Sequence, residues 1–155
     1  MIEPVRYEEG RAMLLAGVRR EHTFAGSEAS VAAQWREFNA MGPVPGRRGG
    51  AAYGVICAGD PEAQTFEYLC GVEVDAFVPG SPFPGRMHVP VQRYAVFEHP
   101  GHVSEVRKMW EEIFGDWLPR SGHTPANGPD FELYGERFDP ATGLGGVEIW
   151  VPVEP

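Results

Sequence analysis

The chain has 155 residues, of which 43% are apolar and 23% are charged, which argues against disorder and suits one well-packed domain or two very small ones. The formal net charge is −9 and no run of Lys and Arg exceeds a pair, so direct nucleic-acid binding is not expected. The first residues lack the basic start and apolar core of a signal peptide, and no apolar run approaches the roughly 18 residues of a membrane helix. We therefore expect a cytoplasmic, acidic protein that does not enter a membrane.

The first half of the chain predicts a strand, a helix and two further strands. Ala12–His22 has the composition of a strand. Ser27–Met41 predicts a helix with Ser27 as its N-cap, because apolar side chains recur at three- and four-residue spacing. GPVPGRRGG ends that helix, and strands are expected at 51–57 and 65–74, joined by the turn GDPEAQ.

The second half predicts the same order of elements after a linker at Phe77–Pro84. Arg93–Glu98 predicts a strand and Val103–Trp117 a helix. LPRSGHTPANGP predicts a loop, and Asp130–Phe138 and Gly146–Val153 predict the two closing strands.

Four pairs of similar segments recur in the same order in both halves. REHTFAGSEASVAAQWREF corresponds to FEHPGHVSEVRKMWEEIF, and GVEV corresponds to GVEI, at a separation of about 75 to 79 residues. We interpret this as an internal duplication, with one repeat over about 1–76 and the other over about 85–155. Two β-α-β-β units packed side by side predict an α+β fold. Its antiparallel sheet would carry both helices on one side, with a ligand cleft at the pseudo-twofold seam.

A carboxylate lies in the apolar middle of one predicted strand. In GPDFELYGERF, Glu132 shares one strand face with Tyr134, while Phe131 and Leu133 share the other. The alternation alone leaves two interpretations open, namely a solvated sheet face and a pocket that receives a positive group.

The second half resembles the GyrI-like, AraC-type effector-binding family, which includes the ligand-sensing domains of BmrR and Rob and also occurs free-standing. The resemblance rests on RYAVFEHPG, IFGDWLPRSG, FELY and VEIWVP in this order, and is strongest over 87–153. It implies a duplicated β-α-β-β fold with an aromatic pocket at the seam. In that pocket a glutamate of the FELY-type strand, here Glu132, contacts lipophilic cations.

Seven further residues are candidates for the pocket lining. Tyr53 is matched to Glu132 by the internal repeat, Tyr134 shares its strand face, and Glu148 is a candidate second carboxylate or a rim residue. The other candidates are aromatic residues, about half of which we expect to be core instead: Tyr68, Tyr94, Trp110 and Trp150.

The only two cysteines, Cys57 and Cys70, are expected to be buried thiols. No catalytic triad, metal cluster or phosphate-binding loop is recognisable, so no catalytic residue, metal or cofactor is predicted.

Three functions remain open at this stage. The first is capture of lipophilic, cationic or flat aromatic small molecules, linked to transcription regulation through a partner protein. The second, which the resemblance also implies, is hydrolysis of strained cyclopropane-type electrophiles, with Glu132 as base and Tyr94 or Tyr134 as acid. The third is a protein-interaction role like that of gyrase inhibitors. Exposed strand edges also permit a homodimer.

Overall fold

A computed structural model describes residues 1–155. Its strands are β1 (Arg6–Gly10), β2 (Met13–Thr23), β3 (Ala52–Asp60), β4 (Thr65–Val74), β5 (Gly85–Val89), β6 (Gln92–His99), β7 (Asp130–Tyr134) and β8 (Val147–Val153). They form one antiparallel sheet in the order β1-β6-β8-β7-β3-β4-β2-β5. The predicted α+β class with an antiparallel sheet is confirmed.

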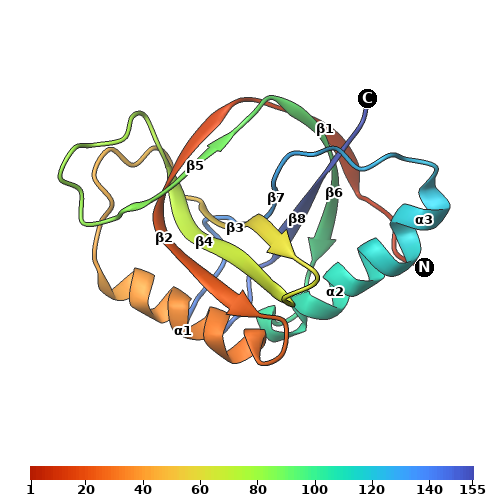
Figure 1. Ribbon diagram of the computed structural model, residues 1–155, viewed down its shortest axis with the longest axis horizontal. Helices are drawn as coiled ribbons and strands as arrows, with labels where there is room; N and C mark the ends of the chain where they lie inside the picture. Colours follow the sequence, from red (N-terminus) through yellow and green to blue (C-terminus); the bar gives the residue numbers. More distant parts are fainter.

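The helices follow the first long strand of each half. Helix α1 spans Ser27–Ala40. In the second half a 3₁₀ turn (Val103–Glu105), α2 (Val106–Glu112), a π-helical turn (Ile113–Trp117) and α3 (Leu118–Ser121) follow one another without a break. Both helical segments lie on the same side of the sheet (Figure 1). None of these helices has the length and apolarity that crossing a membrane requires.

Several details differ from the predictions, among them the end of β3, which runs to Asp60 into the predicted turn. Strands β1 and β5 were not predicted, because RYEEG and GRMHV are short, polar edge strands without a long apolar alternation. Strand β7 ends at Tyr134 instead of Phe138. The N-cap of α1 is Gly26 in a left-handed conformation, so Ser27 is the first helical residue. The predicted loop after Trp117 begins with the short helix α3.

The sheet joins its two β-α-β-β units at the centre and exchanges their edge strands. Strands β3 and β7 pair at the junction between β2-α1-β3-β4 and β6-α2-β7-β8. Strand β1 precedes β2 in the chain but pairs with β6, whereas β5 precedes β6 but pairs with β2. The edge strand of each unit is therefore the strand that comes just before the other unit in the chain.

Apolar side chains fill both faces of the sheet. On the helical face, α1 packs against β2 and β4 through Phe38, and the π-helical turn packs against β6 and β8 through Ile113 and Trp117. The opposite face has no helix, yet Leu15 and Phe131 on it are at most 1% exposed. The sheet encloses this face by its own curvature, because the strands at the two edges arch toward each other (Figure 1). We call it the inner face.

Candidate functional site

Glu132 lies on the helical face at the centre of the sheet and is only 6% exposed. The hydroxyls of Tyr68 and Tyr134 both donate to its Oε1 at 2.7 Å. The indole N–H of Trp110, from α2, donates to Oε2 at 2.7 Å. An ionised carboxylate only accepts hydrogen bonds, so three donors match the charged form of Glu132.

Trp35 of α1 orients the two tyrosines. Its indole N–H donates to the hydroxyl oxygen of Tyr68 at 3.2 Å, which leaves the single proton of that hydroxyl for Glu132. Its ring also packs edge-to-face on Tyr134, with centroids 5.0 Å apart. Side chains from α1, α2, β4 and β7 therefore converge on one carboxylate, which we call the Glu132 cluster (Glu132, Tyr68, Tyr134, Trp110 and Trp35).

Gly54 of β3 makes room for this cluster. It pairs with Glu132 in the β3–β7 register and therefore lies on the same face. A Cβ atom at position 54 would lie 1.9 Å from the Tyr68 hydroxyl oxygen and 2.8 Å from Oε1 of Glu132. Any side chain at this position is incompatible with the observed hydrogen bond between Tyr68 and Glu132.

The two tyrosines remain protonated donors over the physiological pH range. Burial raises the pKa of Tyr68 and of Tyr134 well above 10, and the neighbouring charge of Glu132 raises both further. The tyrosines therefore stabilise the charge of Glu132 without neutralising it.

Asp130, at the start of β7, is a second carboxylate near the site, and too few hydrogen bonds offset the cost of burying its charge. Burial raises the pKa of Asp130 from 3.8 to about 7, a hydrogen bond from its own backbone N–H lowers it in part, and nearby Glu132 raises it. Between these two pH values the folded protein holds a proton that the unfolded chain has lost. Its stability therefore decreases as pH rises through this window.

Replacing Asp130 by asparagine should remove this dependence. We expect the variant to gain about 2 kcal/mol of unfolding free energy over the wild type at pH 8, and only about a quarter of that at pH 4.5, where the aspartic acid is neutral in the fold but already mostly ionised in the unfolded chain. Urea unfolding at both pH values measures the difference. An equal gain at both would show that Asp130 is ionised throughout.

The sequence-predicted residues divide between the two faces of the sheet. Glu132, Tyr134, Tyr68 and Trp110 come together, whereas the other four lie on the inner face around Phe131: Tyr53, Tyr94, Trp150 and Glu148. Glu148 binds the guanidinium of Arg6 at 2.8 and 3.0 Å, and Trp150 stacks on Phe131 with centroids 5.5 Å apart. They stay predictions as ligand contacts, but they do not reach Glu132 in this arrangement.

The repeat alignment places Tyr53 on the wrong face. Tyr53 pairs with Leu133, and Gly54 pairs with Glu132. Because side chains alternate between faces, an offset of one residue sends Tyr53 to the inner face while Glu132 points to the helices. Trp35 and Gly54 belong to the site, although neither was among the residues predicted from the sequence.

Helix α2 contributes Trp110 to the Glu132 cluster and has no fully buried residue. Trp110 also stacks on Phe114 with centroids 5.9 Å apart. The firm anchors of this helical segment, Ile113 and Trp117, lie in the π-helical turn that follows. Trp110 thus closes the site from a helix whose core contacts, through Val106, Met109 and Trp110 itself, are all made by half-buried side chains.

No group of three or more His, Cys, Asp and Glu side chains has the arrangement of a metal site, and both cysteines are free. Burial raises the pKa of the Cys57 thiol to about 11 and also raises that of Cys70. Both therefore remain neutral thiols instead of reactive thiolates.

Comparison with known proteins agrees with this architecture. The transcriptional regulator BrlR of Pseudomonas aeruginosa is 35% identical over 103 residues, which are 66% of this chain but only 37% of BrlR. A DNA gyrase inhibitor of Erwinia billingiae is 29% identical over 116 residues, 74% of this chain and 72% of that protein. The chain thus spans little more than a third of the regulator.

The solved structure of SAV2435 bound to tetraphenylphosphonium has a TM-score of 0.74 at 20% identity, covering 96% of this chain and 93% of that one. At this identity the likeness shows the fold alone. The family model of the GyrI-like small molecule binding domain matches residues 3–154 of the chain. The chain therefore belongs to the GyrI-like family of small-molecule-binding domains.

Proposed function

We propose that the protein binds lipophilic cations at Glu132, among the aromatic side chains that α1, α2, β4 and β7 bring to it. The observation that carries this proposal is the burial of Glu132, which is 6% exposed, accepts hydrogen bonds from three neutral donors and forms no ion pair. Burying a carboxylate with neutral partners alone is costly, and a cation that enters the site offsets that cost. The two tyrosines and two tryptophans around Glu132 are flat apolar surfaces, which suit an aromatic cation.

The selectivity that follows is for positive charge and aromatic apolar surface, with little dependence on the outline of the ligand. Each aromatic face contributes roughly 0.5–2 kcal/mol to a cation near its centre, and burial of the ligand's apolar surface adds to this. Glu132 supplies an attraction that needs no particular hydrogen-bond geometry. Such a site accepts cations of different outlines, and tetraphenylphosphonium, the ligand of SAV2435, combines the required charge and apolar surface.

Ligand entry requires Trp110 to leave Glu132. Its hydrogen bond is the only one of the three that comes from a helix, because Tyr68 and Tyr134 are held on strands. The cation replaces the charge stabilisation that the indole N–H provided. Since α2 has no buried residue, an outward movement of Trp110 disturbs little of the core.

The test is a calorimetric titration with tetraphenylphosphonium and, in parallel, with neutral triphenylphosphine oxide. We expect saturable 1:1 binding of the cation at least about 10-fold tighter than binding of the neutral compound, a difference of about 1.4 kcal/mol. Equal affinities would contradict a role for the charge of Glu132. Absence of binding by both would contradict the proposal as a whole.

The hydrolase alternative has a less suitable arrangement. Tyr134 contacts Glu132 at 2.7 Å, but burial raises the pKa of its phenol, which makes it a weaker proton donor to a leaving group. Tyr94, the other acid considered, is on the inner face. Mass spectrometry of a cyclopropane-containing electrophile after hours with the protein tests turnover directly, and we expect no change in the ligand's mass.

A further inference from the structure

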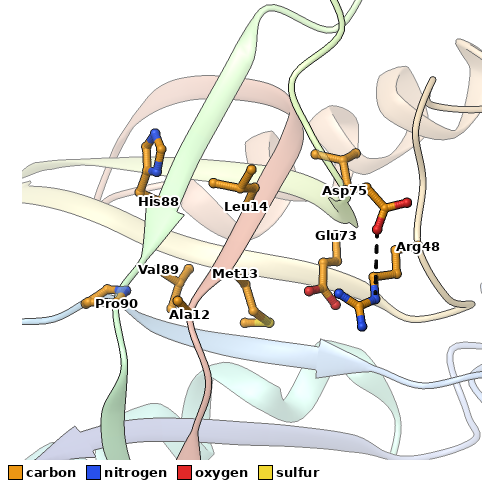
Figure 2. A pocket seen from close by; sticks show the side chains of 10 residues that line it. Ala12, Met13, Leu14, Arg48, Glu73, Asp75, His88, Val89 and Pro90 are labelled. Carbon is orange, nitrogen blue, oxygen red and sulfur yellow. Dashed lines mark ion pairs between the residues drawn. The ribbon is translucent and has the colours of Figure 1, made fainter.

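A pocket of about 490 Å³, whose lining shares no residue with the Glu132 cluster, opens where β2, β4 and β5 lie next to the loop before β3 (Figure 2). Its apolar lining includes Met13, Leu14 and Val89. Arg48, Glu73 and His88 contribute polar atoms. The volume is sufficient for a small aromatic molecule.

Glu73 is the second buried glutamate of the chain, with 5% of its surface exposed. Both of its carboxylate oxygens are bound by one guanidinium, that of Arg11, in a forked arrangement in which Nη2 lies 2.6 Å from Oε1. The desolvation cost of this ion pair falls on Glu73, whose side chain is 7% exposed. Arg11 loses little hydration, because 57% of its side chain stays exposed. The cation thus approaches a buried anion from the solvent side.

This asymmetry makes Arg11 replaceable. It lies between β1 and β2, outside both strands, and its pair with Glu73 lowers the pKa of that carboxyl, so Glu73 is ionised at neutral pH. If Arg11 swings into water, it loses little, since most of its side chain is already solvated. Glu73 would then be a buried charge next to an apolar pocket, able to receive another forked cation.

We propose that this pocket binds a flat aromatic guanidinium or amidinium, which takes the place of Arg11 on Glu73. Met13, Leu14 and Val89 would contact the apolar part of the ligand. A cation is favoured over an anion because the other charged neighbours, Arg48 and Asp75, already pair with each other at 4.0 Å (Figure 2). Removing Arg11 therefore leaves one uncompensated negative charge.

The site is independent of the proposed function at Glu132. Glu73 pairs with Leu15 in the β2–β4 register and therefore points to the inner face, whereas Glu132 points to the helices. A ligand at Glu73 would not contact α1 or α2. Substitutions at one carboxylate should leave binding at the other unchanged.

The experiment titrates the full chain with benzamidinium and with neutral benzamide, following the methyl resonance of Met13 by NMR. We expect benzamidinium to shift this resonance and benzamide to leave it unmoved. In Arg11→Gln the competing guanidinium is gone, and benzamidinium should bind at least about 5-fold more tightly. In Glu73→Gln it should bind at least about 10-fold more weakly.

The control is Glu132→Gln, which removes the carboxylate of the other proposed cation site and should leave the benzamidinium titration curve of the Met13 resonance as it is in the wild type. Urea unfolding of each variant confirms that it is folded, and if Glu73→Gln does not fold, the increase in Arg11→Gln alone decides. Unchanged or weaker binding in Arg11→Gln would overturn the proposal. Loss of the Met13 shift in Glu132→Gln would instead assign the ligand to the Glu132 cluster and overturn it as well.

Discussion

Glu132→Gln should weaken the binding of tetraphenylphosphonium by roughly 30- to 150-fold, equivalent to a loss of about 2–3 kcal/mol. Glutamine preserves the size of the side chain but removes the negative charge on which the proposed selectivity depends. Calorimetric titration of the variant and the wild type under one salt condition measures the ratio. Binding of the cation within about threefold of wild type would contradict the role of Glu132 as counter-ion.

The hydrogen bonds of the cluster also predict how Glu132→Gln affects a neutral ligand. Tyr68 and Tyr134 both donate to Oε1, so the carbonyl oxygen of a glutamine is expected there, and its NH₂ group then faces the indole N–H of Trp110. Two donors cannot bond to each other, so Trp110 is released. The affinity for neutral triphenylphosphine oxide should therefore stay equal or increase while that for the cation decreases.

The matched control is Glu148→Gln. Glu148 is also a strand glutamate that was predicted to contact the ligand, but its carboxylate lies on the inner face and binds Arg6. This substitution should leave tetraphenylphosphonium affinity unchanged. A loss comparable to that of Glu132→Gln would place the cation on the inner face instead.

Gly54→Ala should lower the unfolding free energy by about 2–4 kcal/mol, which combines overpacking with the loss of a buried hydrogen bond. The added methyl group would lie 1.9 Å from the Tyr68 hydroxyl oxygen, so the tyrosine ring must move and leave Glu132. Because Tyr68 is 2% exposed, the surrounding core gives it little room. Urea unfolding measures the stability, and cation titration measures the accompanying loss of affinity.

Gly59→Ala is the control for this substitution. Gly59 also lies in β3, but no atom comes within 4 Å of the position its Cβ would occupy. We expect a stability change within about 0.5 kcal/mol and unaltered cation binding. If Gly54→Ala were as mild as Gly59→Ala, Tyr68 would have an alternative position from which it still reaches Glu132.

The sequence predicts which residues share a face of β7, but not which face the helices cover. Glu132 and Tyr134 lie together as the alternation requires. Phe131 and Leu133 are as apolar as residues that meet helices, yet they face the inner side, because the curved sheet buries that side without any helix. Apolar content on both sides of a strand therefore removes the signal that would have separated Tyr94 and Trp150 from Tyr68.

Other parts of the site depend on distances that local sequence does not encode. The role of Gly54 follows from the reach of Tyr68 across a neighbouring strand. Trp35 has the spacing of a core residue on α1, and only the position of its N–H against the Tyr68 hydroxyl shows its second role. Arg11 and Glu73 are 62 positions apart, and no motif connects them.

The exchange of edge strands makes the two halves of the sheet interlocked. A fragment that ends in the segment between β4 and β5 keeps β1 but loses β6, its hydrogen-bonding neighbour, and the complementary fragment keeps β5 without β2. Each fragment alone exposes an unpaired edge, whereas the two mixed together restore every ladder of the sheet. The chain is thus suited to complementation of its two fragments, with ligand binding at Glu132 as a readout of their reassembly.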